Sequence, residues 1–488
     1  MTKLDQKITP LFDALQKYVS DDTVQFHVPG HKQGKGLPEF MEFVGQNTLA
    51  IDLTCLPDLD NICNSVSTIK HAQQLAAEAY KADHSYFLVN GTTYGIQAMI
   101  MAVCEPGDKI IIPRNAHKSA VGGLILSGAQ PIYIEPQIHP DFGISMGITA
   151  EAVEEALSQH PDAKAVFVVY PTYYGTACDL KAIVEVSHAR NVPVVVDEAH
   201  GAHLAFHDAL PVSAIECGAD ISASSTHKLA GSMTQSSILL LREGLVNPQK
   251  VKAVLNLTQT TSPSYVLMAS LDIARKQMAL KGKELLDRTL KLTSYARKEL
   301  AETPGLELLD ENVIGKFGCV AFDPTKITVN VLGLGLSGYE MERILRDQYR
   351  LQVELADLYN VIFLVTIGDD MESINYLIET VKKIAASCSL GKVVKYCPKL
   401  PGIPELVVSP REAFYSDIKF VPFQDAEGEI CAEMIMAYPP GIPLVLPGER
   451  ISRDIIDYVE VLKKENAELQ GTEDPEINFI RVLQHQIV

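Results

Sequence analysis

Long hydrophobic runs are missing from this sequence of 488 residues. No apolar stretch approaches the ~18 residues that a membrane-spanning helix needs, and the best ones, such as 165–170 and 192–196, have the length of a strand. The first twenty residues are interrupted by charges such as Lys3 and Asp5, so they lack the apolar core of ~7 to 15 residues that a signal peptide carries. We therefore expect a cytoplasmic protein without a membrane segment.

Basic residues are also in short supply. The chain has 42 Lys and Arg against 61 Asp and Glu, a formal net charge of −19. Such an excess of negative charge repels a phosphate backbone, so nucleic acid is not an expected partner. The nine cysteines are never closer than eight positions apart, which excludes a CxxC pair for zinc or redox chemistry. We expect reduced, mostly buried thiols and no metal site.

What the sequence does contain is an alternation of strands and helices between Ser65 and Leu241. The strand-length runs are continuously apolar, which is typical of strands covered on both faces, and the segments between them have helical spacing. This alternation predicts a large α/β domain with a mainly parallel sheet. The expected strands are 84–89, 109–112, 131–135, 165–170, 193–198, 219–224 and 237–241, and the expected helices include 93–104, 150–160 and 179–190.

Changes in composition suggest four parts. Residues 1–40 form an N-terminal segment and 41–300 the large domain, which ends in a long helical stretch, Tyr265–Ala301. Residues 301–392 have a second, smaller α/β pattern. Proline-punctuated short runs from 393 to 488 predict a C-terminal α+β domain. Strand candidates in the small domain are 320–322, 327–331, 352–355 and 361–365.

The segment after the first strand of the large domain suits an anion. Residues 87–89 are followed by NGTTYG at 90–95 and then by a helical run. The first turn of a helix offers unpaired N–H groups and a positive dipole, so a phosphate fits there. A threonine at a helix start is also an ordinary N-cap, so both interpretations stay open at this point.

Two further strands end in charged side chains. Asp197 follows four apolar residues and opens the segment DEAHGAH, and Lys228 lies in the small-residue segment 224–231 after the next strand. In open α/β sheets, ligands bind at the carboxyl ends of the strands. Alone, each residue is equally a paired acid or a surface lysine. Together, a phosphate site, a carboxylate able to hold a pyridine nitrogen protonated and a lysine able to bond a carbonyl are what pyridoxal phosphate requires.

Seven motifs in a fixed order carry a resemblance to a known family. The sequence resembles the group III Orn/Lys/Arg decarboxylases of aspartate-aminotransferase fold over nearly its whole length, which implies a pyridoxal-phosphate enzyme of fold type I. The motifs are HVPGHKQGKG (27–36), FLVNGTTYG (87–95), PRNAHKS (113–119), YPTYYG (170–175), VDEAHGAH (196–203), SSTHKLAGSMTQSS (224–237) and YPPGIPLVLPGE (438–449).

The resemblance also implies roles for single residues. Lys228 would bind pyridoxal phosphate through its amine, and Asp197 would hold the pyridine nitrogen protonated. Ala199 would pack beneath the ring and His117 would stack on its other face. His200 stands where the large acid-induced members carry an aromatic residue, so it receives no role. The residues expected to hold the phosphate are Gly91, Thr92, Thr93, Ser225 and His227.

The expected reaction is decarboxylation of a basic amino acid. Resemblance to the short, arginine-specific members of the family favours L-arginine, giving agmatine and CO₂ for polyamine biosynthesis, over lysine and then ornithine. A long basic substrate needs a partner for its distal cation, and carboxylates supply one. Glu354 and Asp357, in QVELADLYN, are the candidates for this role, with a solvated surface pair as the alternative.

The fold further implies a homodimer in which each site is completed by the partner. Thr261 and Ser262 are candidates for reaching the neighbour's phosphate, and a simple turn before the helix at 265 is the alternative. The large acid-induced family members carry an additional N-terminal receiver-like domain that builds decamers. Here HVPGH begins at residue 27, so assembly by that route is not expected.

Other functions compete with this hypothesis. GLGLSG at 333–338 fits the dinucleotide fingerprint G-x-G-x-x-G, but Ser337 and Glu340 also form a capping box that explains the turn without a cofactor. A transaminase or an aldolase-type lyase would use the same Lys228 and Asp197. A regulatory homologue without activity is disfavoured because the mapped cofactor positions are intact.

Overall fold

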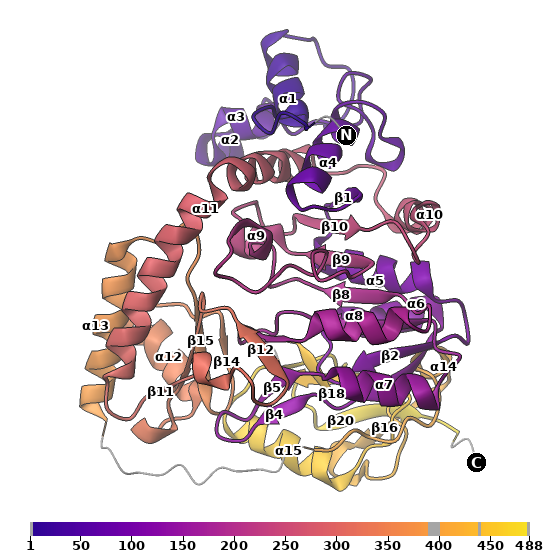
Figure 1. Cartoon of the computed structure of the whole chain (residues 1–488), viewed down its shortest axis with the longest axis vertical. Coiled ribbons are helices and arrows are strands. Elements are labelled where there is room, and N and C mark those ends of the chain that lie inside the picture. The colour runs from indigo at the N-terminus through magenta and orange to yellow at the C-terminus, as the bar shows by residue number, and fades with distance from the viewer. Residues whose placement is uncertain (1–2, 389–400, 438–440, 486–488) are drawn as a thin grey trace. The chain divides into compact units, whose positions relative to one another are not determined.

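The computed structural model describes residues 3–388, 401–437 and 441–485 (Figure 1). The described chain forms two compact units, which we call unit 1 and unit 2. Unit 1 consists of Met1–Ala102 and Val195–Leu286, and unit 2 of Val103–Val194 and Asp287–Val488. The predicted start of the C-terminal domain at 393, Cys397 and the first three residues of the motif at 438–449 lie outside the described residues.

Four strands of unit 1 lie side by side in the order β1-β10-β9-β8 (Figure 1). β8 and β9 are parallel, whereas β10 is antiparallel to both β9 and β1. Every residue of β8, β9 and β10 is buried, as their continuous apolar or small-residue sequences predict. The strands are β1 (His84–Leu88), β8 (Val194–Asp197), β9 (Ile221–Ser224) and β10 (Ser237–Leu241), and the helices that follow or precede them include α5 (Gly91–Val103), α9 (Thr226–Leu229) and α10 (Pro248–Thr258).

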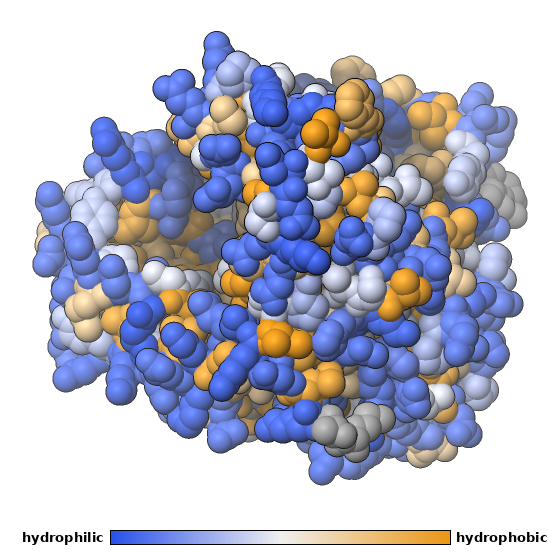
Figure 2. Space-filling model, turned by 90° about the horizontal axis from the view of Figure 1, so that it is seen from above, coloured by the Kyte–Doolittle hydropathy of each residue, from blue (hydrophilic) through white to orange (hydrophobic). Residues whose placement is uncertain are grey.

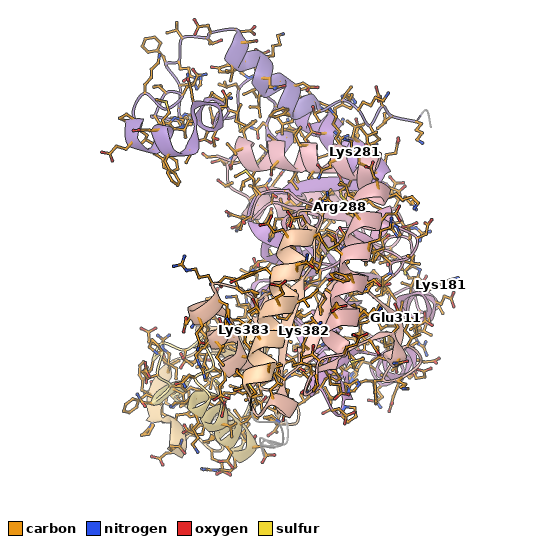
Figure 3. The ribbon with its side chains drawn as sticks, turned by 90° about the vertical axis from the view of Figure 1, so that its left-hand side faces the viewer. Lys181, Lys281, Arg288, Glu311, Lys382 and Lys383 are labelled. Atoms are coloured by element: carbon orange, nitrogen blue, oxygen red, sulfur yellow. The ribbon has the colours of Figure 1, made fainter. Side chains whose placement is uncertain are left out.

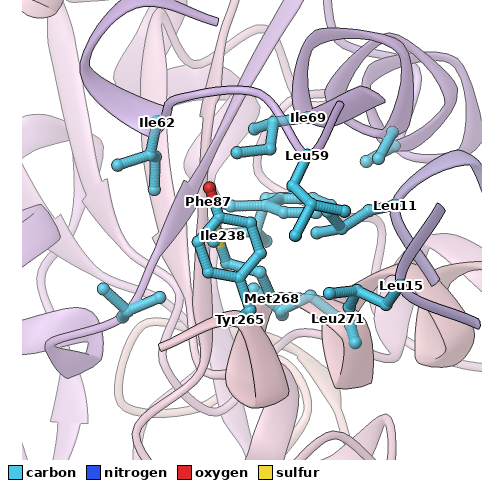
Figure 4. Close-up of a cluster of buried hydrophobic side chains, with 14 of the residues drawn as sticks. Leu11, Leu15, Leu59, Ile62, Ile69, Phe87, Ile238, Tyr265, Met268 and Leu271 are labelled. Carbon is cyan, nitrogen blue, oxygen red and sulfur yellow. The ribbon is translucent and has the colours of Figure 1, made fainter. Parts of the chain in front are cut away.

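A hydrophobic core holds the N-terminal helices of unit 1 to its sheet (Figure 4). Leu11 and Leu15, one helical turn apart, pack with Phe87 of the sheet and with Tyr265. The Tyr265 hydroxyl donates a 2.6 Å hydrogen bond to the carbonyl of Asp60, so the one polar atom of this ring is satisfied inside the core. The helices involved are α1 (Pro10–Ser20), α4 (Thr68–Ala79) and α11 (Tyr265–Ala301), and the short helices α2 (Pro38–Val44) and α3 (Gln46–Ala50) lie between the first two in sequence.

Unit 2 contains a second set of parallel strands, in the order β6-β2-β3. Their connections are helices, as the alternation in the sequence predicts. The strands are β2 (Lys109–Pro113), β3 (Gln130–Ile134) and β6 (Ala165–Val169), and the helices are α6 (Lys118–Ser127), α7 (Ala150–Gln159) and α8 (Leu180–His188). Shorter pairs are β4 (Gln137–His139) with β5 (Ile144–Gly147) and β7 (Thr176–Cys178) with β12 (Cys319–Phe322).

The small α/β domain of unit 2 is a four-stranded antiparallel sheet covered by helices. Its core joins α12, α13 and the last turns of α11, and Figure 3 shows Arg288 on α11 beside α13, which carries Lys382 and Lys383. The Arg288 guanidinium donates to the carbonyl of Ile367 at 2.5 Å. The elements are β11 (Glu307–Leu308), β13 (Lys326–Asn330), β15 (Asn360–Leu364), β14 (Leu355–Ala356), α12 (Gly338–Tyr349) and α13 (Met371–Ser387).

The C-terminal part of unit 2 mixes short antiparallel sheets with two helices and has a core of its own. It therefore has the α+β character expected from its proline-punctuated sequence. Its elements are α14 (Pro410–Tyr415), β16 (Ile418–Pro422), β17 (Ile435–Ala437), β18 (Ile442–Val445), α15 (Arg453–Lys464), β19 (Leu469–Gln470) and β20 (Phe479–Leu483).

The face of the molecule drawn in Figure 2 is largely hydrophilic. Figure 2 shows hydrophobic residues in small groups among hydrophilic ones on the face viewed from above. Among the described residues, none of the helices combines the length and the apolar character that crossing a membrane requires. Even α11, with 37 residues, is polar on average.

Most predicted elements are confirmed to within two residues, but the strand predicted at 352–355 is wrong. Helix α12 ends at Tyr349, its C-cap Arg350 has a left-handed conformation, and only Leu355 and Ala356 pair with β15. The strand predicted at 320–322 exists as β12, yet it pairs with β7 rather than with the small sheet. Short apolar runs do not specify their partner, because periodicity alone carries no information on pairing.

Local structure accounts for the glycines at 333–338: Gly333 and Gly338 pack closely against backbone atoms, and Gly335 has a left-handed conformation. Ser337 and Glu340 form the predicted capping box at the start of α12, with both hydrogen bonds present. A Cβ on Gly338 would stand 2.2 Å from the backbone oxygens of both Asp357 and Asn360. Close packing and a cap therefore account for a pattern that resembles a dinucleotide fingerprint.

We predict that Gly338→Ala destabilises the protein by ~1–3 kcal/mol, because the added methyl group overpacks against backbone atoms that cannot rotate away. Gly368→Ala is the matched control, since its Cβ would meet only the Thr366 hydroxyl at 3.6 Å. Far-UV circular dichroism during thermal unfolding measures the effect, because the chain has no tryptophan. Equal melting temperatures for the two variants would contradict this account of Gly338.

Candidate functional site

Asp197 and Lys228 lie at the same edge of the unit 1 sheet. Asp197 is the last residue of β8, and Lys228 is in α9, which starts two residues after β9 ends at Ser224. The two strands are parallel, with Asp197 opposite Ala223, so their carboxyl ends meet at one edge. The sequence-based placement of both residues at strand ends is confirmed.

Asp197 is almost fully buried, with 5% of its surface exposed. Burial raises the pKa of its carboxyl to about 6, while the Ala199 N–H, at 3.1 Å, and the charge of Lys228 act in the opposite direction. The group is therefore mainly ionised at neutral pH. A buried anion of this kind is stabilised by a cationic or N–H donor placed against it, as a protonated pyridine nitrogen would be.

Lys228 contacts His200, a residue to which the sequence assigned no role. The Lys228 Nζ and the His200 Nε2 are 2.7 Å apart. His200 is 4% exposed and lies three residues after Asp197, in the loop that leaves β8. Its position in that loop, close behind a strand-end carboxylate, is the sequence feature that could have identified it.

A cluster of hydroxyl groups lies at the start of α5. The Thr92 Oγ1 is 2.5 Å from the Ser225 Oγ and 2.6 Å from the Ser237 Oγ. All three side chains are buried, and Ser237 was not among the predicted residues. Thr93 is exposed on the same turn, and the N–H of Gly91 already donates to the carbonyl of Gln235 at 2.8 Å.

These donors fit a phosphate group. The hydroxyls of the cluster, together with the N–H groups and the dipole of the first turn of the 13-residue helix α5, form a neutral, donor-rich end facing the loop that carries Ser225. The cluster is compatible with the anion site that the sequence predicts at the start of α5.

His227 has a defined tautomer. Its Nδ1 is 2.8 Å from the carbonyl oxygen of Ser236, which can only accept, so Nδ1 carries the proton. Burial lowers the pKa of the imidazole, helped by the charge of Lys228, against the opposing effect of the Ser236 bond. A neutral His227 therefore offers Nε2 as an acceptor, and it would bind a phosphate through a phosphate hydroxyl or after taking up a proton.

Glu198 faces the other side of the sheet from Asp197, as successive strand residues do. Its Oε1 accepts the N–H of Ala214 at 2.7 Å, and its Oε2 accepts the hydroxyls of Ser222 and Ser224 at 3.1 Å each. Burial raises the pKa of Glu198 to about 7 against the effect of these three donors. The carboxylate connects the end of β8 to β9 just before the Lys228 segment.

The remaining predicted residues have different surroundings. Thr261 and Ser262 are exposed, in the turn between α10 and α11 of unit 1. In unit 2, His117 is the N-cap of α6 and accepts the N–H of Ser119 at 3.2 Å. Glu354 follows α12 and lines a surface pocket with Arg350 and other residues.

Asp357 is occupied by its own turn. Its Oδ1 accepts the N–H groups of Tyr359 and Asn360 at 2.8 Å each, and its Oδ2 accepts the Tyr174 hydroxyl at 3.2 Å. The Asn360 side-chain amide also donates to it at 2.9 Å. Because the carboxylate already has these donors, it holds the turn between β14 and β15.

Comparison with protein-family models gives two matches that follow each other along the chain. Residues 9–373 match the major domain of the Orn/Lys/Arg decarboxylases, and residues 396–478 match their C-terminal domain. The chain belongs to the Orn/Lys/Arg decarboxylase family. The resemblance seen in the seven motifs is thereby confirmed.

Individual relatives span the same length. A protein of Bacillus subtilis named arginine decarboxylase is 47% identical over 99% of both chains. The lysine decarboxylase LdcA of Pseudomonas aeruginosa is 26% identical and covers 98% of this chain and 78% of its own. The solved lysine decarboxylase LdcF of Francisella novicida has a TM-score of 0.83 at 22% identity, covering 98% of this chain and 81% of that one, which shows the shared fold.

We predict that Glu198→Gln flattens the pH dependence of stability. The pKa of Glu198 rises from 4.5 to about 7 on folding, so the folded state binds this proton more tightly than the unfolded chain. The free energy of unfolding therefore falls as the pH rises from ~4.5 to about 7 and levels off above that. The neutral glutamine removes this fall.

The measurement is thermal unfolding at several pH values between 5 and 8. Glu243→Gln, at an exposed carboxylate 2.9 Å from the His84 Nε2, is the control and should follow the parent chain. An unchanged slope in Glu198→Gln would mean that Glu198 does not titrate in this range.

Proposed function

We propose that this chain is a pyridoxal-phosphate-dependent decarboxylase that converts L-arginine to agmatine and CO₂. The observation that carries the proposal is the 47% identity, over 99% of both chains, to the Bacillus subtilis protein named arginine decarboxylase. The site in unit 1 supports the cofactor, because a buried acid, a lysine and a donor-rich helix start lie at strand ends of one sheet.

Each group of the site has a task in this proposal. The Lys228 amine would attach the cofactor, and the Asp197 carboxylate would hold a proton on the ring nitrogen. Thr92, Ser225 and the first turn of α5, with Gly91 and Thr93, would bind the phosphate. When bound, pyridoxal phosphate supplies an electron sink for the bond to the departing carboxylate.

Ala199 and His117 complete the proposal for the ring. Ala199, two residues after Asp197, would lie under the ring, and its N–H already donates to the Asp197 carboxylate, which would face the ring nitrogen. His117 would stack on the opposite ring face, with Ser119 holding its imidazole through Nδ1. A transaminase would use the same residues, so the measured product, CO₂ or a keto acid, separates the two reactions.

Glu354 is our candidate for the distal cation of the substrate. Its carboxylate is a suitable partner for a guanidinium, since a planar fork of N–H groups binds both carboxylate oxygens. Asp357 was proposed beside it, and its hydrogen bonds to Tyr359, Asn360 and Tyr174 make it the residue that shapes the local turn. Any contribution of Asp357 to substrate binding would therefore be electrostatic, without a direct contact to the distal cation.

We further propose a cytoplasmic homodimer that acts in polyamine biosynthesis. The exposed turn with Thr261 and Ser262 would then reach the phosphate in the neighbouring subunit. The exposure of both side chains leaves them available for such a contact. Sedimentation at working concentration, together with activity, tests whether the dimer is the active form.

We predict that Lys228→Ala abolishes turnover while the protein still folds, because the amine is only half-buried and is not part of a hydrophobic core. Mass spectrometry of peptides after borohydride reduction should locate the cofactor on Lys228 in the parent chain. Lys81→Ala, at an exposed lysine paired with Glu216, is the control and should keep full activity. An adduct on Lys118 or another lysine would overturn the assignment.

We predict that arginine has the highest kcat/KM among arginine, lysine and ornithine. If lysine were better by tenfold, which is about 1.4 kcal/mol in transition-state stabilisation, the arginine proposal would be wrong.

Glu354→Gln should lower kcat/KM for arginine by at least tenfold, because it removes the charge that pairs with the guanidinium. Glu379→Gln, at an exposed position of α13, is the matched control. If Glu354→Gln changed no substrate's kcat/KM, the distal pocket would lie elsewhere.

A further inference from the structure

We propose that His200 is a catalytic base for Lys228. Its Nε2 takes a proton from the Lys228 ammonium, so that a neutral amine attacks the carbonyl carbon of the cofactor. The inference rests on the proposed function for the identity of that carbonyl compound. It rests on the structure for the pairing of the two nitrogens.

The distance between the two nitrogens requires them to share a proton. At 2.7 Å, the Lys228 Nζ and the His200 Nε2 are hydrogen-bonded, and a hydrogen bond needs one donor and one acceptor. An ammonium facing an imidazolium has two donors and no acceptor. The pair therefore carries one proton fewer than two isolated cations would.

The surroundings favour a single positive charge on this pair. His200 is 4% exposed, and a buried site disfavours a second like charge. Asp197, from β8, interacts with Lys228 and balances one positive charge. Other titratable groups near this edge include Glu198 on the opposite sheet face, Tyr80, which interacts with Glu198 and Thr226, His203 in the same loop, and His227 of α9, whose own pKa the charge of Lys228 helps to lower.

The proposed step is balanced in protons. The ammonium gives one proton to His200, and the neutral nitrogen of Lys228 forms a bond to the carbonyl carbon. The carbonyl oxygen receives one proton from the amine and one that His200 returns, and it leaves as water. In each turnover the Lys228 amine is displaced by the substrate amine and must return, and on its return it attacks again as a neutral nitrogen while the product amine leaves. The same base therefore serves every turnover.

The test follows the joining of the cofactor to the full-length protein. Hydroxylamine removes the bound cofactor, pyridoxal phosphate is added back after dialysis, and stopped-flow absorbance measures the rate between pH 6 and 10. His200→Gln keeps a hydrogen-bonding side chain but cannot take up a proton, and His200→Ala leaves space for added imidazole. We expect both variants to join the cofactor at least tenfold more slowly, and imidazole to restore part of the rate in His200→Ala only.

His84→Gln, at a surface histidine that pairs with Glu243, is the control and should join at the parent rate. If His200→Gln joined the cofactor as fast as the parent chain does, the proposal would be overturned, because a hydrogen-bonding side chain that takes up no proton would then be enough for the reaction. If the parent chain itself gave no borohydride-stable adduct on Lys228, the proposed function would fail instead.

A measurement on the parent chain decides the question if the His200 variants do not fold. With His200 as base, the joining rate should depend less steeply on pH than that of an exposed lysine, which reacts only through the small fraction that has lost its proton below a pKa near 10.4. The reaction of Lys81 with the same aldehyde, followed by peptide mapping, supplies that exposed reference in the same sample. A joining rate that rises in parallel with Lys81 up to pH 10 would overturn the proposal.

Discussion

Hydrogen bonds to the buried carboxylate of Glu198 hold the strand ends of unit 1 that carry the site. Glu198 accepts hydrogen bonds from the loop residue Ala214 and from Ser222 and Ser224 of the neighbouring strand, and its own N–H donates to the carbonyl of Ala223. Three elements are thereby fixed at one point. The residue before Glu198 is Asp197, and the residues after Ser224 lead into α9, so the same contacts set where the acid and the lysine stand.

Side chains at the end of β8 point alternately to the two faces of the sheet, so neighbouring residues have different partners. Asp197 and Glu198 are adjacent, and because strand side chains point to opposite faces, one carboxylate serves the ligand edge while the other serves the sheet. Both are withdrawn from water, and burial raises the pKa of each, to about 6 and about 7. Charge interactions of these two buried carboxylates are stronger than they would be in water, because the surrounding dielectric constant is lower.

Packing explains several residues whose patterns suggested chemistry. The glycines at 333–338 match a dinucleotide fingerprint, yet Gly338 is needed because two backbone oxygens stand where a Cβ would be. Asp357 matches a cation ligand, yet its oxygens close a turn against Asn360 and Tyr174. In both cases the sequence matches the motif, and the contacts in the folded chain show that the residues have a structural role.

Local sequence patterns are enough to predict the order of strands and helices and to place Asp197 and Lys228 at strand ends. These follow from local periodicity and from residue types that are costly to bury, such as a carboxylate after four apolar residues. Wrong or incomplete predictions concern pairing, as for the strand at 352–355, where a left-handed Arg350 ends the helix and only two residues join the sheet.

Contacts between side chains that are distant in the sequence could not be predicted from it. His200 and Lys228 are 28 positions apart, and Thr92 and Ser237 are 145 apart, yet each pair is in hydrogen-bond contact. Such contacts depend on strand register and on how loops leave the sheet, and no local pattern encodes either. A shift of one residue in β9 against β8 would turn its serines away from Glu198, because the side-chain period of a strand is two.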